Sequence, residues 1–256
     1  MRRLLCVTTL AAAFTAVHAG ADPSKPHPHT GVLKKYDRVP PSKIGLGNLG
    51  VADEELRQGE PVLKKINLPG GWIRSVSVQD VRAPEKVVWQ AINDLPRYPK
   101  MVDGVVKCDV YSREKKMSGE TTVCATYTLK AAGVSLTYYM KHIFEPRKHC
   151  MTFHLDYDRC SELSDSVGYW YVEDMKDGWC RVYYSTDSKL PSFVPGFLKD
   201  KLTSMAAKRS TSWVDTRCNE LTGRGSGGKA KGPGLLKKAL LAALVAGAWH
   251  FRLALL

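Results

Sequence analysis

The sequence predicts an α+β fold: a curved antiparallel β-sheet wrapped around a long C-terminal α-helix, with two short helices after the first strand. Three observations predict it. Six segments within residues 105–188 alternate apolar and polar side chains, as strands with one buried face do. A helical pattern of apolar residues follows Pro195 and runs to about Cys218. A proline-led helical segment precedes the six strands.

The first strand is expected in the extended segment 60–81, which Pro69, Gly70 and Gly71 interrupt. Pro84 suits the first turn of a helix ending near Ile92, because a first-turn residue needs no backbone N–H partner. Residues 95–99 allow a second short helical turn.

In the remaining strands, apolar and polar side chains alternate, and the apolar side chains mark the buried face. In the strand 134–144, Leu136, Tyr138 and Met140 share one face, and Ser135 and Thr137 share the other. The C-terminal helix needs an apolar surface to cover, and the apolar face of the sheet provides one. The six strands are expected at residues 105–113, 121–131, 134–144, 150–157, 167–174 and 181–188.

Composition indicates one globular domain of ordinary hydrophobic content. The 256 residues are 44% hydrophobic and 25% charged, with a net charge of +13. Much of the positive excess lies in segments before residue 53 and after residue 220. No nucleic-acid-binding motif accompanies the charge, so nucleic acid is not an expected partner.

The N-terminal segments read as targeting sequence and linker. Residues 1–19 combine Arg2 and Arg3, a short apolar stretch and small residues before a cut after Ala19, as in a secretory signal peptide. Residues 20–52 are basic and Pro-rich, which suits a disordered linker or the second part of a plastid address. Entry into the secretory pathway is therefore expected, with a lumen, the extracellular space or a plastid as the destination.

The folded domain is expected over residues 53–220, followed by a Gly-rich linker at 221–234 and a hydrophobic tail at 235–256. Lys237, Lys238, His250 and Arg252 interrupt the tail, and its longest apolar run is shorter than a full membrane span requires. Three interpretations stay open: a membrane anchor, a helix lying in the interface, and a cleaved signal for a lipid anchor.

Two stretches near the first helix, VRAPEKVVW at 81–89 and LPRYP at 95–99, resemble the opening of the START-like superfamily. This superfamily includes polyketide cyclase/dehydrase, lipid-transport and coenzyme Q-binding proteins. The segments 151–158, 164–172, 181–185 and 193–197 look similar to its plastid-type members in plants and algae. The resemblance implies a helix-grip fold around an apolar cavity, and it implies no catalytic residue.

Other chemistry finds little support. His142 and His154 fall on opposite strand faces, so a histidine metal site is not expected. The acidic residues around Asp156 and Asp165 lack the spacing of a calcium loop and suggest a solvated connection. The six cysteines after the leader form no CxxC pair, and free thiols are the preferred interpretation over disulfides.

The function expected is the binding of an apolar lipid, isoprenoid or prenylquinone between sheet and helix, without a cofactor or metal. Transfer of this ligand between membranes is a further expectation. A cyclase/aromatase-like enzyme and a membrane-tethered chaperone with a filled core are the alternatives. Bulky aromatic and Met side chains suit an adaptable apolar pocket, although each of them also suits a packed core. The predicted ligand-binding residues are Tyr138, Met140, Phe153, Trp170, Tyr184, Phe193, Phe197, Leu198 and Met205.

The link between the last strand and the C-terminal helix, residues 191–197, combines two prolines and a glycine with apolar side chains. Phe193 and Val194 are too apolar for an ordinary exposed loop. Two interpretations remain: the loop plugs one end of the core, or it is a ligand gate that meets a membrane surface.

Overall fold

The structure is a computed structural model, and it describes residues 21–24, 56, 60–131, 133–192, 194–196, 199 and 211–224. Most of the predicted linkers and the whole of the hydrophobic tail, residues 235–256, lie outside these residues, as does the predicted signal peptide. No helix among the described residues is both long enough and apolar enough to cross a membrane.

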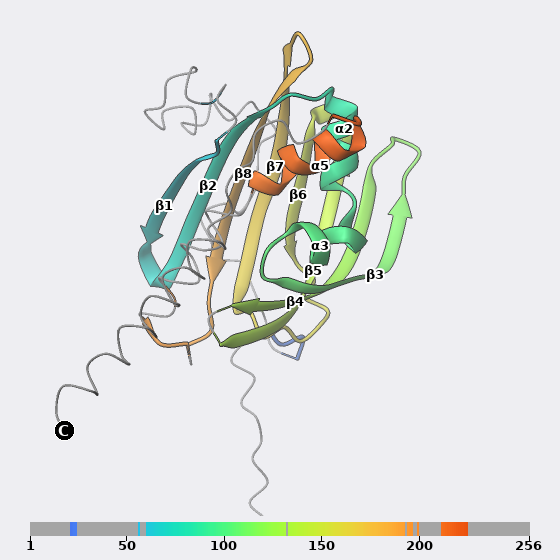
Figure 1. Ribbon diagram of the computed structural model, residues 1–256. Helices are drawn as coiled ribbons and strands as arrows, with labels where there is room; N and C mark the ends of the chain where they lie inside the picture. Colours follow the sequence, from blue (N-terminus) through green and yellow to red (C-terminus); the bar gives the residue numbers. More distant parts are fainter. Residues whose placement is uncertain are drawn as a thin grey trace, which may run out of the picture.

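The described chain forms one eight-stranded antiparallel sheet in the order β1-β2-β8-β7-β6-β5-β4-β3 (Figure 1). Strands β3 to β8 follow one another as a meander, and β8 then pairs with β2. The bounds of the strands are β1 Val62–Leu68, β2 Trp72–Val81, β3 Val105–Lys115, β4 Thr121–Ala131, β5 Val134–Glu145, β6 Cys150–Leu155, β7 Asp165–Lys176 and β8 Trp179–Lys189.

The six predicted strands are all present, but the predicted first strand is in fact two. β1 and β2 form a hairpin around a 3-10 turn, Pro69–Gly71. Gly70 and Gly71 have φ values of 73° and 77°, a region that glycine enters without a steric penalty. The two short helices therefore follow the second strand, not the first.

Helices α2 (Glu85–Ile92) and α3 (Tyr98–Met101) connect β2, which is next to the edge strand β1, with β3 at the other edge of the sheet. The 3-10 turn Leu95–Arg97 lies between them. Together with α5 (Ser212–Leu221), they lie on one face of the sheet, which we call the inner face (Figure 1).

The C-terminal helical region differs from the single continuous helix that the sequence suggests. Lys199 N donates to Pro195 O at 3.0 Å, which is a helical hydrogen bond. At Thr211, however, φ is −123°, and α5 begins after it. The Thr211 hydroxyl lies 2.7 Å from that of Ser77 on β2, and such side-chain bonding competes with helical geometry.

The main core lies between the inner face and these helices. Val81, Ile92, Val182 and Val214 are among its fully buried members. Ala21 also belongs to it: its backbone N–H donates to Leu163 O at 3.3 Å, and its carbonyl accepts from Ser161 N at 2.8 Å. The chain just after the predicted cleavage point is thus packed against the β6–β7 connection.

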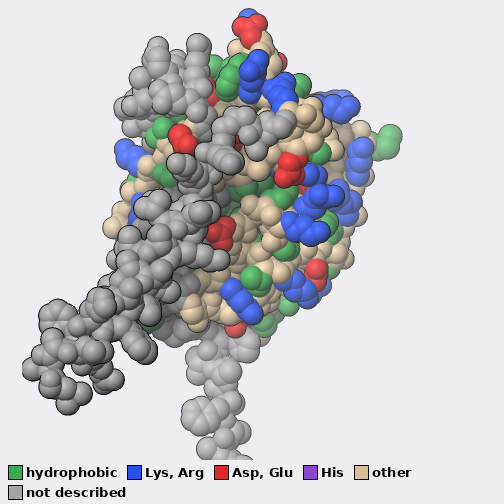
Figure 2. Space-filling model, viewed as in Figure 1, with side chains coloured by type: hydrophobic (Ala, Val, Ile, Leu, Met, Phe, Trp, Pro, Cys, Tyr) green, Lys and Arg blue, Asp and Glu red, His purple; other side chains and the backbone are tan. Residues whose placement is uncertain are grey.

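The six described cysteines are free thiols, and Cys160 alone among them is exposed. The surface in Figure 2 carries Lys and Arg side chains spread over several elements, with acidic side chains between them. The large exposed hydrophobic side chains among the described residues, Val106, Met117 and Met175, lie on different strands or turns.

Candidate functional site

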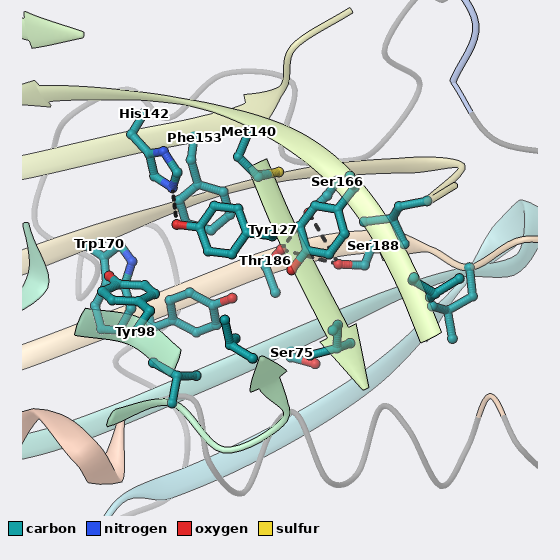
Figure 3. Close-up of a pocket in the computed structure, with 18 of the residues that line it drawn as sticks. Ser75, Tyr98, Tyr127, Met140, His142, Phe153, Ser166, Trp170, Thr186 and Ser188 are labelled. Carbon is teal, nitrogen blue, oxygen red and sulfur yellow. Dashed lines mark hydrogen bonds between the residues drawn. The ribbon is translucent and has the colours of Figure 1, made fainter. Parts of the chain in front are cut away.

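A cavity of about 250 Å³ lies between the inner face of the sheet and the helices (Figure 3). Its volume lies slightly below the roughly 300–1,000 Å³ common for small-molecule pockets. The described lining residues are mostly aromatic or aliphatic: Ile73, Ser75, Tyr98, Val102, Asp103, Val105, Tyr127, Leu129, Leu136, Tyr138, Met140, His142, Phe153, Leu163, Ser166, Trp170, Tyr184, Thr186, Ser188, Leu190 and Trp213.

The structure places five of the nine predicted ligand-binding residues in this wall. They are Tyr138, Met140, Phe153, Trp170 and Tyr184, which come from the four adjacent strands β5 to β8. The other four predicted residues lie outside the described part of the chain: Phe193, Phe197, Leu198 and Met205.

Aromatic rings form much of the wall, and they contact one another in pairs. Tyr127 and Tyr138 stack with centroids 5.5 Å apart. Phe153 stacks on Tyr184 at 5.8 Å, and Trp170 contacts Tyr184 at 4.6 Å. Such contacts fix the rings and leave flat apolar surfaces toward the open volume.

One glycine makes room for this ring layer. Gly168 on β7 lies opposite Phe153 on β6. A Cβ atom added at Gly168 would lie 2.5 Å from Phe153 Cζ and would also collide with the Ser185 carbonyl oxygen. The absence of a side chain at residue 168 therefore allows the Phe153 ring to lie over the strand.

A polar pair interrupts the apolar wall on β4 and β5. The Tyr127 hydroxyl lies 3.2 Å from His142 Nε2, and His142 Nδ1 lies 3.3 Å from the Val123 carbonyl oxygen. The carbonyl can only accept, which assigns the proton to Nδ1 and leaves Nε2 to accept from Tyr127. Burial lowers the pKa of His142 to about 4, so the imidazole is neutral at neutral pH.

From its place in the sequence, His142 was weighed by name only as a metal ligand. Its position two residues after Met140, on the apolar face of β5, was the available signal for an inward-facing polar group. The described residues include no group of three or more side chains that could hold a metal ion.

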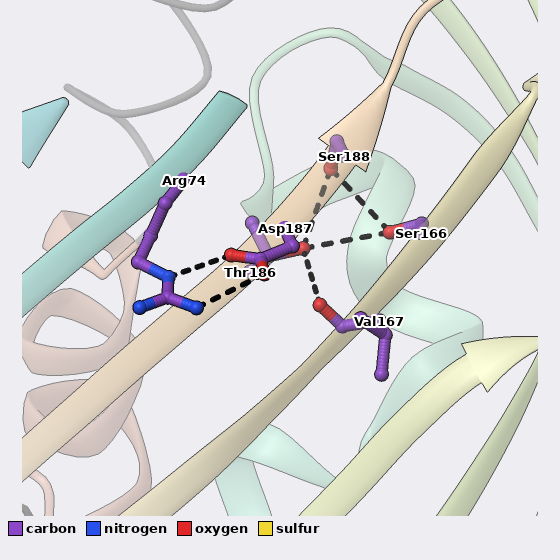
Figure 4. A network of polar contacts seen from close by, with 6 residues as sticks. All are labelled: Arg74, Ser166, Val167, Thr186, Asp187 and Ser188. Atoms are coloured by element: carbon purple, nitrogen blue, oxygen red, sulfur yellow. Dashed lines mark hydrogen bonds and ion pairs between the residues drawn. The ribbon is translucent and has the colours of Figure 1, made fainter. Parts of the chain in front are cut away.

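A second polar region consists of hydroxyl groups on β2, β7 and β8. Ser75, Ser166, Thr186 and Ser188 all line the cavity. Ser166, Thr186 and Ser188, which we call the hydroxyl cluster, contact one another at 3.3–3.5 Å (Figure 4). These hydroxyl residues were not predicted as site residues, because Ser and Thr on a strand more often indicate a solvated face.

The ionisable groups of the described wall give it little charge. They are Asp103, which is exposed, the neutral His142 and four tyrosines, and the described lining contains no Lys or Arg. Burial raises the pKa of Tyr184 to about 12 and also raises the pKa of Tyr138. Apart from the exposed Asp103, the described wall is thus electrically neutral at physiological pH.

Two further predictions concerned the connections between elements. In the link 191–197, Val194 is only 2% exposed, which agrees with a plug and not with a side chain waiting to contact a membrane. The predicted solvated acidic connection is wrong in part, because Asp156 and Asp165 are buried. Asp156 accepts from the Tyr111 hydroxyl at 2.5 Å, and Asp165 accepts from that of Tyr157 at 2.9 Å.

The sheet order, the inward-facing cavity and the helices on one face define a helix-grip protein. Among solved structures, a Thermus thermophilus protein has a TM-score of 0.50 and 14% sequence identity over 58% of this chain and 98% of that one. The Zhui aromatase/cyclase from Streptomyces has a TM-score of 0.48 and 14% identity, covering 61% and 99%. A STAR-related lipid transfer protein from Xanthomonas axonopodis has a TM-score of 0.48 and 9% identity, covering 61% and 98%.

No protein-family model matches the sequence, and no curated protein matches it. At such low identities, the structural likeness concerns the fold. The START-like, helix-grip fold implied by the sequence resemblance is therefore confirmed.

Proposed function

We propose that this protein binds one uncharged, largely apolar molecule, such as a lipid, isoprenoid or prenylquinone, in the cavity and carries it between membranes. The observation that carries the proposal is the open volume within an otherwise close-packed core. Protein interiors normally leave few voids larger than a water molecule. Removing apolar ligand surface from water supplies roughly 25 cal/mol per Å².

Mass spectrometry of organic extracts tests the binding proposal directly. The full chain, purified without detergent, is expected to yield about one small molecule per chain. Met140→Trp fills the cavity and should abolish this yield. Met117→Trp is the matched control, because Met117 is fully exposed, and it should retain the ligand. Equal ligand content in both variants would disprove the cavity as the binding site.

The Tyr127–His142 pair supports a second candidate, an enzyme of the cyclase/aromatase kind. A neutral imidazole hydrogen-bonded to a phenol can relay a proton to or from a bound substrate. The test is whether an extracted compound is converted on incubation with the protein, and whether Tyr127→Phe stops the conversion while ligand binding persists.

We also propose that the chain enters the secretory pathway, is cleaved after Ala19 and is held at a membrane by its tail. Support comes from the sequence patterns at the two ends. Cleavage there retains Ala21, which packs in the core. N-terminal sequencing of the mature protein tests the cleavage, and imaging of fluorescent fusions to residues 1–50 and 221–256 tests the destination and the anchor.

A further inference from the structure

The three hydroxyls of the hydroxyl cluster stand out because their mutual contacts are poor. The Thr186 hydroxyl lies 3.3 Å from Ser188 Oγ and 3.4 Å from Ser166 Oγ, and Ser166 Oγ lies 3.5 Å from Ser188 Oγ. Ordinary O–H···O bonds have oxygen separations of 2.5–3.0 Å. Thr186 also reaches the Val167 carbonyl oxygen, again at 3.3 Å, and it hydrogen-bonds the Tyr184 hydroxyl.

A neighbouring hydroxyl pair shows what a structural contact looks like in this fold. Ser77 and Thr211 are both fully buried, and their hydroxyl oxygens are 2.7 Å apart. That pair ties β2 to the start of α5 and does not line the cavity. The hydroxyl cluster, by contrast, connects strands that the backbone ladder already joins, and its side chains border open volume.

The backbone behind the cluster is firmly held. On the opposite face of the sheet, Arg74 makes two hydrogen bonds to Asp187, at 2.7 and 3.0 Å (Figure 4). Asp187 lies between Thr186 and Ser188, so this ion pair fixes the strand that carries two of the three hydroxyls. The cluster hydroxyls are thus held in place, but their mutual hydrogen bonds are long. Such a preorganised group favours recognition of a bound ligand.

Resting on the proposed ligand-binding function, we propose that the hydroxyl cluster recognises an uncharged oxygen-bearing group, a hydroxyl or a carbonyl, of the cavity's ligand. A hydroxyl can donate to a carbonyl or exchange bonds with another hydroxyl. A carboxylate or phosphate would need a cation to offset its burial, and the described wall contains no Lys or Arg. The ligand class is therefore a neutral alcohol, phenol, ketone or quinone.

The Tyr127–His142 pair is the competing polar group in the cavity. The neutral imidazole has one donor and one acceptor, and Val123 O and the Tyr127 hydroxyl engage both. Because the protons of both groups already face a partner, the pair has no donor left for a ligand carbonyl, which makes it the poorer site.

Isothermal titration calorimetry with three probes of one ring system tests the proposal. The probes are 2-naphthol, naphthalene and 2-naphthoate, added to the full-length protein after lipid extraction. We expect 2-naphthol to bind at least tenfold more tightly than naphthalene, and 2-naphthoate to bind most weakly. In Thr186→Val and Ser166→Ala, the preference for 2-naphthol should fall to about threefold or less, while naphthalene affinity stays the same.

Ser77→Ala is the control, since it removes a hydroxyl outside the cluster, and it should keep the tenfold preference. If naphthalene and 2-naphthol bind the wild type equally, or if Tyr127→Phe removes the preference and the cluster variants do not, the proposal is overturned while ligand binding stands. If no probe binds and no ligand is extracted, both this proposal and the proposed function fail.

Discussion

The two faces of the β2–β8–β7 sheet region treat polar side chains in opposite ways. On the outer face, Arg74 and Arg181 each form a bidentate pair, with Asp187 and Asp80 respectively, at distances of 2.7–3.0 Å. On the inner face, the members of the hydroxyl cluster contact one another at 3.3–3.5 Å. The outer face therefore carries two strong ion pairs, whereas the hydroxyl cluster on the inner face has only long mutual contacts beside an open volume.

The outer face also carries a second apolar cluster. Tyr169, Tyr171 and Tyr183 pack there with Val78 and with Leu56, which precedes β1. Because side chains alternate along each strand, adjacent residues serve the two faces separately. The same strands therefore do two things: ion pairs on their outer face hold them rigidly, and their inner face borders the open cavity.

The largest expected effect comes from breaking the Arg74–Asp187 ion pair on the outer face. Asp187→Ala removes the fully buried partner of Arg74 and should lower the free energy of unfolding by about 3–5 kcal/mol, because a largely buried charge loses its partner. Urea unfolding measures the loss. Asp109→Ala, which breaks the exposed pair with Lys107, should leave the free energy of unfolding nearly unchanged, because solvent screens that pair. Similar losses in both variants would mean that the outer pair has no special role.

Lowering the pH should reduce the stability of the fold through protonation of His142 on the inner face. Its pKa is about 4 in the folded chain and 6.5 in the reference state, so the unfolded chain binds more protons between these values. Stability should therefore fall as pH decreases from about 6.5 to about 4, by up to about 3 kcal/mol from this group. Urea unfolding at several pH values should show a shallower decline for His142→Gln. Parallel profiles for the two proteins would contradict the assignment.

A smaller loss is expected from filling the space beneath the ring of Phe153. Gly168→Ala should cost about 1–3 kcal/mol, because the added methyl group meets Phe153 and the Ser185 carbonyl. Thermal unfolding measures the change. Gly196→Ala is the matched control, since a Cβ there has no atom within 4 Å, and it should leave the melting temperature nearly unchanged. Equal behaviour of the two variants would show that the close approach is not required.

The sequence by itself determined the strands from β3 to β8, because period-two alternation depends only on the next few residues. It also placed Tyr138, Met140, Phe153, Trp170 and Tyr184 on inward faces, and the structure confirms their position in the cavity wall. The β1–β2 hairpin was missed, although Gly70 and Gly71 marked the turn.

Only the tertiary structure decided which inward polar residues meet. Ser166 is separated from Thr186 by the whole β7–β8 hairpin, and their contact depends on the register of that pair. The Tyr127–His142 contact likewise requires the β4–β5 register. A single-residue slip would reverse the face of every side chain, so register, which is set by long-range pairing and packing, turns an alternating pattern into a site.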